Sequence, residues 1–187
     1  MHVKKIAILA SGSGTNAEAI TRFFQQSDKG MVVLICSNKT NAYVLERARQ
    51  LGVPSMIFSK QDLESGVLTQ QLVEQKIDWV VLAGFLLKVP ENLIQAFPNK
   101  IVNIHPALLP KFGGKGMYGA HVHEAVKAAG ETHTGITIHL VNEQYDEGKI
   151  IFQAAVEVTP EDTPESIASK VHELEYKYFP NVIESLL

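Results

Sequence analysis

Short apolar segments alternate along the chain with segments of helical periodicity, and this alternation limits the fold more than any other feature. The apolar segments lack the regular polar alternation of a half-exposed strand, which is typical of strands buried on both faces. They cover residues 6–9, 31–36, 55–58, 79–82 and 101–104. Apolar residues at helical spacing lie between them, in residues 16–24, 43–51, 68–77 and 91–97. Strands that alternate with helices form right-handed crossovers, so we expect an α/β fold with a doubly wound, mostly parallel sheet.

The C-terminal part follows a different pattern, with two strands before one long helix. Residues 134–141 (TGITIHLV) alternate apolar and polar side chains, which predicts a half-buried strand in which His139 is a structural, hydrogen-bonded residue. Residues 149–158 predict a further strand. Thr163 and Pro164 are typical of an N-cap and a first helical position, and an apolar stripe at helical spacing follows them. No repeat or linker interrupts the chain, so we predict a single domain over residues 1–187.

Length and charge exclude several classes of function. A chain of 187 residues supplies one sizeable core, and a formal net charge of −3 gives no basic surface for nucleic acid or an anionic membrane. The single cysteine, Cys36, excludes an internal disulfide and fits a reducing compartment. The first apolar run is shorter than a signal peptide and leads directly into a glycine-rich loop, so we interpret it as a strand. We expect a cytoplasmic protein that binds neither nucleic acid nor membranes.

Residues 11–16 (SGSGTN) follow the first predicted strand, where the next helix should begin. Glycines allow the backbone to come close to an anion, and the first N–H groups of a helix favour negative charge, so the segment predicts a phosphate site. With Ala17 it also matches a dinucleotide fingerprint. However, the acidic residue that such a site needs is absent from residues 36–39 (CSNK), and no Lys-Ser/Thr pair follows the glycines as in a Walker loop. A tight turn that binds nothing remains the alternative.

Asn103 and His105 stand two residues apart at the end of the fifth apolar segment. Alternate residues of an extended backbone point to the same face, so the amide and the imidazole converge. Such a pair can donate hydrogen bonds to a developing oxyanion and transfer a proton. The alternative is a polar pair whose hydrogen bonds are satisfied within the fold. His121 and His123 form a second spaced pair, but without the partners that a zinc site requires, so we predict no metal.

Two segments carry a resemblance to a known family. Residues 103–110 (NIHPALLP) resemble the signature of the folate-dependent formyltransferases, and residues 146–148 (DEG) resemble the second half of that signature. The similarity runs essentially from end to end and implies a Rossmann-like N-terminal half. It also implies transfer of a formyl group from the cosubstrate 10-formyltetrahydrofolate to an amine, with Asn103, His105 and Asp146 as catalytic residues. Asp146 would pair with His105, hold it in the charged form and so raise its pKa.

The phosphate loop narrows the resemblance to one branch of this family. The GSGTN segment is similar to the loop of the members that formylate glycinamide ribonucleotide in de novo purine biosynthesis. The resemblance implies that Gly14, Thr15 and Asn16 hold the 5′-phosphate of this substrate. It further implies that Glu175, with His172 beside it, contacts the ribosyl or phosphate end.

The resemblance also implies a folate site and a division of the chain. About residues 1–100 would bind the nucleotide phosphate, and about residues 101–187 would catalyse transfer and hold the folate. In this family the apolar loop after the fourth strand packs on the flat pterin, and some relatives carry arginine at the position of Leu87. The residues implied in folate binding are Leu86, Leu87, Lys88, Val89, Asn103, His121 and Val141.

Two other functions stay open. One is a formyltransferase for a different amine, such as a nucleotide sugar, which the compact phosphate loop disfavours. The other is a nucleotide-binding module without catalysis, which would need the phosphate loop but not Asn103, His105 and Asp146 together. The expected partners are the two small-molecule substrates, and the expected assembly is a monomer or a weak homodimer.

Overall fold

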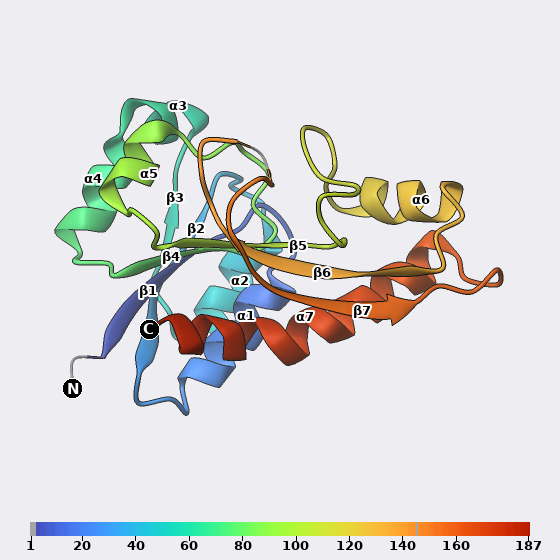
Figure 1. Ribbon diagram of the computed structural model, residues 1–187. Coiled ribbons are helices and arrows are strands. Elements are labelled where there is room, and N and C mark those ends of the chain that lie inside the picture. The colour runs from blue at the N-terminus through green and yellow to red at the C-terminus, as the bar shows by residue number, and fades with distance from the viewer. Residues whose placement is uncertain (1–2, 145) are drawn as a thin grey trace.

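Within residues 3–144 and 146–187, which the computed structural model describes, seven strands form one sheet in the order β3-β2-β1-β4-β5-β6-β7 (Figure 1). The strands are β1 (Lys4–Leu9), β2 (Gly30–Ser37), β3 (Ser55–Ile57), β4 (Trp79–Leu82), β5 (Ile101–His105), β6 (His133–Leu140) and β7 (Ile150–Glu157). The first five run parallel, whereas β6 pairs antiparallel with β5 and β7 pairs antiparallel with β6. The predicted doubly wound, mostly parallel α/β sheet is confirmed.

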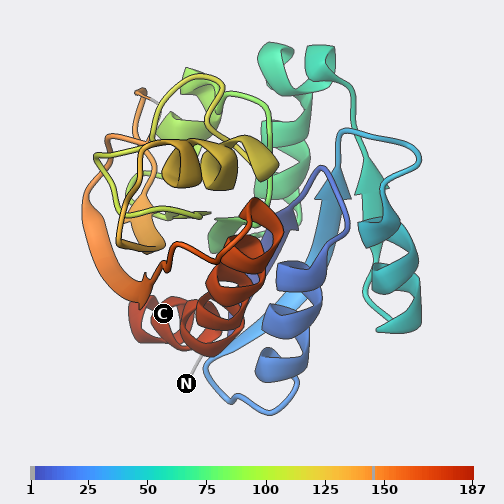
Figure 2. The same cartoon turned by 90° about the vertical axis from the view of Figure 1, so that its right-hand side faces the viewer.

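Helices cover both faces of this sheet (Figures 1 and 2). They are α1 (Thr15–Phe24), α2 (Tyr43–Gln50), α3 (Lys60–Ser65), α4 (Val67–Glu74), α5 (Glu91–Ala96), α6 (Ala120–Ala128) and α7 (Pro164–Leu186). The sequence did not predict α3, because this short helix buries only Leu63 and begins at a capping box between Ser59 and Asp62 rather than along an apolar stripe. Among the described residues, no helix combines the length and apolarity needed to cross a bilayer.

Alternate residues of the central strands enter two separate cores. In β1, Ile6 and Ile8 pack with residues of α1, α2 and α7, whereas Ala7 and Leu9 pack with residues of α3, α4 and α5. All four side chains are completely buried, which explains why the sequence shows a continuous apolar run here. Full burial of an aliphatic side chain contributes about 1.5–3 kcal/mol, so the two cores hold the strand ends in fixed positions.

The prediction that the strand around residues 134–141 is half-buried was wrong. Side chains on both faces of β6 are buried from Thr134 to His139. The polar side chains are covered by loops: the Thr137 hydroxyl donates to the carbonyl oxygen of Ala107 (2.7 Å) and accepts from the Leu109 N–H (3.0 Å). A polar side chain at alternate positions therefore marks hydrogen bonding under a loop here, not exposure to solvent.

Helix α7 lies beside α1 (Figure 2), and Glu175 in its middle accepts a hydrogen bond from Asn16 at the start of α1. Its start is fixed by the predicted Thr163 cap, whose hydroxyl accepts from the Ser166 N–H at 3.2 Å. The preceding Asp162 accepts from the Lys170 ammonium at 2.6 Å, from the Ser166 hydroxyl at 2.7 Å and from the Thr159 N–H at 2.8 Å. These contacts with Lys170, Ser166 and Thr159 lower the pKa of Asp162 below its ordinary value of 3.8.

A charge-removing substitution tests whether Asp162 holds the start of α7. Because the folded state favours the ionised carboxyl, its stabilising contribution is present above pH 4 and is lost as the pH falls through the lowered folded pKa. Asp162→Asn should therefore lower the Tm at pH 7 and lower it less at pH 2.5, where the unfolded state already binds the proton. Calorimetry of this variant beside Glu161→Gln, a neighbour that is exposed, would measure both differences. An equal loss of Tm at both pH values would contradict the ion-pair account.

Candidate active site

A cavity of about 610 Å³ lies at the carboxyl ends of β1, β4 and β5. Parallel strands end at the same edge of a sheet, so the loops that leave them form adjacent walls. The loops after β1, β4 and β5 provide three of these walls, the segment after β6 closes the cavity from the antiparallel side, and α7 contributes His172 and Glu175.

All but one of the predicted site residues line this cavity. They come from every part of the chain: Gly14, Thr15, Asn16, Leu86, Leu87, Lys88, Val89, Asn103, His105, Val141, Asp146, His172 and Glu175. His121 is not among the lining residues. Its side chain is exposed at the start of α6, where Nδ1 lies 3.4 Å from the Glu124 carboxylate.

The glycine loop before α1 is held in place through its carbonyl oxygens. The Val44 N–H donates to the Gly12 carbonyl at 3.1 Å, and the Arg47 side chain donates to the Ser13 carbonyl at 2.8 Å. Gly14 has φ 78° and is buried, and a Cβ there would lie 2.8 Å from Val44 Cα. At Gly12, by contrast, an added Cβ would meet no atom within 4 Å. Gly14 is therefore required by packing against α2, whereas Gly12 faces open space in the cavity.

Beyond the glycines, the wall of the cavity is polar, and one of its buried polar atoms has no hydrogen-bond partner. Asn16 donates through Nδ2 to the Glu175 carboxylate at 2.8 Å, while its Oδ1 is buried without a hydrogen-bond partner. Glu175 is 5% exposed, and burial raises the pKa of its carboxyl, although Asn16 and His172 act in the opposite direction. A buried polar atom without a partner is costly in a folded protein, so this wall is suited to a ligand that supplies hydroxyl groups.

The opposite wall is apolar. The loop after β4 presents Leu86, which is 39% exposed, next to the buried Val89. The Leu86 N–H donates to the Ser11 hydroxyl at 3.1 Å, which fixes this loop to the end of β1. Val141 packs with the same group of apolar residues. An apolar surface opposite a polar one is typical of sites that bind an aromatic ring system beside a polar substrate.

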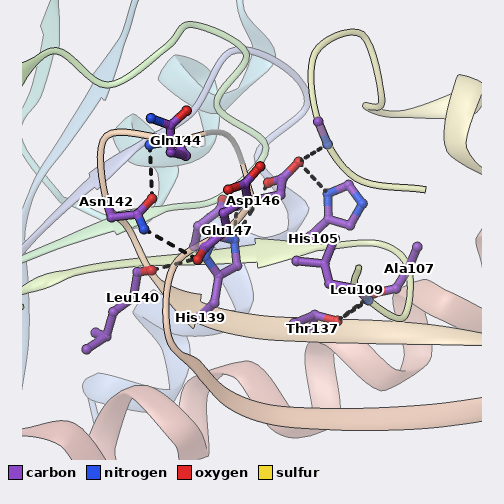
Figure 3. Close-up of polar contacts among 12 residues, drawn as sticks. His105, Ala107, Leu109, Thr137, His139, Leu140, Asn142, Gln144, Asp146 and Glu147 are labelled. Atoms are coloured by element: carbon purple, nitrogen blue, oxygen red, sulfur yellow. Dashed lines mark hydrogen bonds and ion pairs between the residues drawn. The ribbon is translucent and has the colours of Figure 1, made fainter. Parts of the chain in front are cut away.

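His105 and Asp146 meet in the cavity as the sequence predicted (Figure 3). The Asp146 carboxylate lies 3.6 Å from Nδ1 of His105 and accepts the Gly114 N–H at 2.9 Å. The other imidazole nitrogen of His105, Nε2, lies 2.7 Å from the Phe112 carbonyl, and since a carbonyl only accepts, Nε2 carries the hydrogen. A hydrogen bond therefore holds Nε2 of His105, and the Asp146 carboxylate lies within ion-pair distance of Nδ1.

The predicted direction of the His105 pKa was wrong. His105 is 3% exposed, and burial lowers its pKa more than Asp146 and the Phe112 carbonyl raise it. The sequence revealed the ion pair but not the cost of desolvation. Burial would also raise the pKa of Asp146, but His139, His105 and the Gly114 N–H together hold it below its ordinary value. The carboxylate is thus the charged member of the pair near neutral pH.

His139 is a site residue that sequence reasoning placed outside the site. It is indeed hydrogen-bonded and 2% exposed, but Nε2 lies 3.0 Å from Nδ2 of Asn103 and 3.7 Å from the Asp146 carboxylate. The antiparallel register of β5 and β6 sets His139 directly opposite Asn103. A sequence pattern predicts that two strands exist but not which residues pair across them. The contact between His139 and Asn103 therefore could not be predicted from the residues around either one.

His123 is a second residue that the sequence did not assign to the cavity. It is 3% exposed, its Nδ1 is buried without a partner, and its ring lies 6.5 Å from that of His172. Burial lowers the pKa of His123 to about 4, with smaller effects from His172 and His105, so the ring is neutral at pH 7. Among the residues that the structure describes, no three His, Cys, Asp or Glu side chains are grouped as metal ligands.

The two opposing effects on His105 can be measured directly. We expect the pKa of His105 to lie below its ordinary value of 6.5 and to fall further in Asp146→Asn, because the substitution removes the charge that partly offsets burial. NMR titration of ¹⁵N-histidine would give both values, and the exposed His133 serves as an internal control. A pKa above 6.5 in the wild-type protein would show that ion pairing exceeds desolvation.

Known proteins are similar to this chain in sequence and in fold. The family model described as formyl transferase matches residues 4–183. The phosphoribosylglycinamide formyltransferase of Bacillus subtilis is 39% identical over 191 residues, which cover 99% of this chain and 95% of that protein. The chloroplastic phosphoribosylglycinamide formyltransferase of Arabidopsis thaliana is 43% identical over 190 residues, which cover 98% of this chain but 65% of that relative, just under two thirds of its length.

Solved structures agree with these relatives. The crystal structure of glycinamide ribonucleotide transformylase 1 from Geobacillus kaustophilus matches with a TM-score of 0.91 at 35% identity, and the match covers 100% of both chains. Phosphoribosylglycinamide formyltransferase from Streptococcus pneumoniae matches with a TM-score of 0.88 at 39% identity, over 98% of this chain and 99% of the other. By sequence and by fold, the chain belongs to the formyl transferase family.

Proposed function

We propose that the chain transfers the formyl group of 10-formyltetrahydrofolate to the amine of glycinamide ribonucleotide, giving N-formylglycinamide ribonucleotide in purine biosynthesis. The observation that carries the proposal is the convergence of Asn103, His105 and Asp146 in one cavity that also holds a glycine loop and an apolar wall. A nucleotide-binding module without catalysis would require the loop alone. The similar proteins of Bacillus subtilis and Arabidopsis thaliana support the choice of this amine.

The glycine loop is suited to the 5′-phosphate. The first N–H groups of a helix have no intrahelical partner, and those of α1 begin at Thr15, directly beside Gly12 and Ser13 in the cavity lining. Glu175, the Oδ1 of Asn16 and the Nδ1 of His123 lie farther along this wall. Because Glu175 and Oδ1 are acceptors, they suit the ribosyl hydroxyls better than the phosphate. We therefore assign Gly14, Thr15 and the backbone around them to the phosphate, and Asn16, Glu175 and His172 to the ribosyl end.

The apolar wall is suited to the folate. Leu86, Leu87 and Val89 give a flat pterin a dry surface, and Val141 extends it. The backbone of Lys88 lies within the same loop. The folate supplies the formyl group for transfer, and the residues of this wall orient it against Asn103. His121, which the family resemblance also implicated, lies outside the cavity lining and would contact only a part of the folate that extends past α6.

Transfer places negative charge on the formyl oxygen while the attacking amine loses a proton. Asn103 has two Nδ2 hydrogens, and only one of them is used by His139, so the second can stabilise that oxygen. Asp146 is ionised and lies in the same cavity, so it can accept the amine proton directly or through water. A proton added to His105 would go to Nδ1, which faces Asp146, and the positive charge would make its Nε2–H a stronger second donor to the oxyanion.

This chemistry requires an exchange of hydrogen bonds at His105. Its Nε2–H donates to the Phe112 carbonyl, so it reaches a substrate oxygen only when that contact is released. Phe112 has φ 55°, a conformation that costs a non-glycine residue about 1 kcal/mol or more, and the loop that follows contains Gly114 at φ 93° and Gly116 at φ 88°. Residues 114–119 of this loop line the cavity, so a bound substrate can contact the segment whose Phe112 carbonyl holds His105.

A direct assay tests the proposed function. The purified protein is mixed with glycinamide ribonucleotide and 10-formyltetrahydrofolate, and both the deformylated folate and the mass of the formylated product are measured. Asp146→Asn serves as the catalytic control. Turnover with glycinamide ribonucleotide and none with an amino sugar nucleotide is expected. The reverse preference, or release of formate without a formylated product, would contradict the proposal.

The phosphate loop is tested by two glycine substitutions with different predicted outcomes. Gly12→Ala places a methyl group into open cavity space, so it should raise the KM for glycinamide ribonucleotide about tenfold and leave the KM for the folate and the Tm nearly unchanged. Gly14→Ala should instead destabilise the fold by about 1–3 kcal/mol, because its Cβ collides with Val44. Steady-state kinetics and thermal denaturation separate the two effects. Equal increases of both KM values in Gly12→Ala would contradict the assignment of the loop.

We further propose that these small molecules are the only partners and that the protein acts in the cytoplasm as a monomer or a weak homodimer. Sedimentation velocity over a range of concentrations would determine the assembly.

A further inference from the structure

When the His139 ring is neutral, its contact with Asn103 has one arrangement of hydrogens that satisfies every atom around it. His139 Nδ1 lies 3.1 Å from the carbonyl oxygen of Leu140, which can only accept, so Nδ1 carries the hydrogen. In the neutral imidazole Nε2 is then an acceptor. Its neighbours are Asn103 Nδ2 at 3.0 Å and the Asp146 carboxylate at 3.7 Å, which lies beyond hydrogen-bond distance. Only the Asn103 amide can supply the missing hydrogen.

The opposite orientation of the Asn103 amide would leave two conflicts. Turning Oδ1 toward Nε2 would require a hydrogen on Nε2, and a neutral ring would then present a bare Nδ1 to the Leu140 carbonyl. The flipped amide would also place Oδ1 where Nδ2 now lies. The second N–H of Asn103 would then no longer be available to the formyl oxygen. The tautomer of His139 and the orientation of Asn103 therefore determine each other.

The residues packed around His139 hold its hydrogen bond to the Leu140 carbonyl in place. The side chain is 2% exposed, and its neighbour Leu140 is fixed by a backbone bond from Leu140 N–H to the Lys149 carbonyl at 2.9 Å. Gly148 passes directly over the bond between His139 and Leu140: a Cβ at Gly148 would collide with the Leu140 carbonyl oxygen and lie 3.3 Å from His139 Nδ1. The absence of a side chain at Gly148 leaves room for this hydrogen bond (Figure 3 shows His139, Leu140 and Asp146 together).

We infer that His139 is a positioning residue that accepts from Asn103 through Nε2 and thereby fixes the Asn103 amide with its second N–H available for the formyl oxygen. The inference rests on the proposed function for its kinetic consequence, but the arrangement of hydrogens is a property of the ligand-free protein. His139 thus acts on the reaction through Asn103, whereas its distance to Asp146 is too long for a direct hydrogen bond.

The tautomer is tested first, without substrates. Long-range ¹H–¹⁵N correlation spectra of the protein at pH 7.5 should show His139 with its hydrogen on Nδ1. A hydrogen on Nε2 would overturn the inference, whatever the activity of the protein. Failure of the formylation assay together with the Nδ1–H tautomer would instead refute the proposed function and leave the arrangement of hydrogens intact.

The kinetic test uses two variants at His139. Gln retains a side-chain acceptor that can take the place of Nε2, whereas Phe retains a flat ring without any acceptor. We expect His139→Phe to lower kcat at least tenfold with both KM values within about twofold, and His139→Gln to recover most of the loss. His133→Gln, at the exposed start of the same strand, is the matched control and should not change kcat. Thermal denaturation identifies a variant that loses activity through unfolding.

A double-mutant cycle decides whether His139 acts through Asn103. In the Asn103→Ala protein, which has no amide to orient, His139→Phe should lower kcat less than twofold. A full tenfold loss in that background would overturn the inference. So would a cycle in which the effect of His139→Phe disappears in Asp146→Asn but not in Asn103→Ala.

Discussion

A buried carboxylate between two buried imidazoles is the interaction on which the rest of this site depends. Asp146 lies 3.6 Å from His105 and 3.7 Å from His139, and all three side chains are largely withdrawn from water. Removing an ion from water costs several kcal/mol unless neighbouring groups compensate for it. Here the Gly114 N–H donates to the carboxylate at 2.9 Å and helps to hold the pKa of Asp146 below its ordinary value despite burial. The same burial leaves His105 less basic than a free histidine.

This arrangement is possible because the chain brings β5, β6 and the segment after β6 together at one edge of the sheet. Strand β5 supplies Asn103 and His105, and the antiparallel β6 sets His139 across from Asn103. Close backbone packing fixes the connecting segments. Gly14 lies against Val44 at the start of α1, and Gly148 lies against the Leu140 carbonyl beside the carboxylate. Neither position has room for a side chain, so these glycines determine where the loops lie rather than giving them freedom to move.

The sequence predicted the parts of this molecule that have local signals. Continuous apolar runs predicted β1, β2, β4 and β5, because buried parallel strands carry apolar side chains on both faces. The resemblance to the family signature implied that Asn103, His105 and Asp146 lie together, and all three line one cavity of the structure.

What the sequence could not predict depends on contacts between distant segments. His139 required the register of two strands, and the buried polar face of β6 required the loop that covers Thr137. His121 and His123 look equivalent in the sequence, but two residues of helix place them on different sides, so one is exposed and the other buried. The lowered pKa of His105 depends on a desolvation cost that only the packed structure reveals.

The central claim is that Asp146 and His105 act on the reaction as one unit. It is tested most directly by the kcat values of the wild-type protein, Asp146→Asn, His105→Ala and the double variant, with glycinamide ribonucleotide and 10-formyltetrahydrofolate both saturating. Loss of a group that stabilises the developing charge costs about 3–4 kcal/mol, so each single substitution should lower kcat by roughly two to three orders of magnitude. The double variant should be no more than about threefold slower than the slower single variant. Fully additive losses, or a near-normal kcat in Asp146→Asn, would contradict this account.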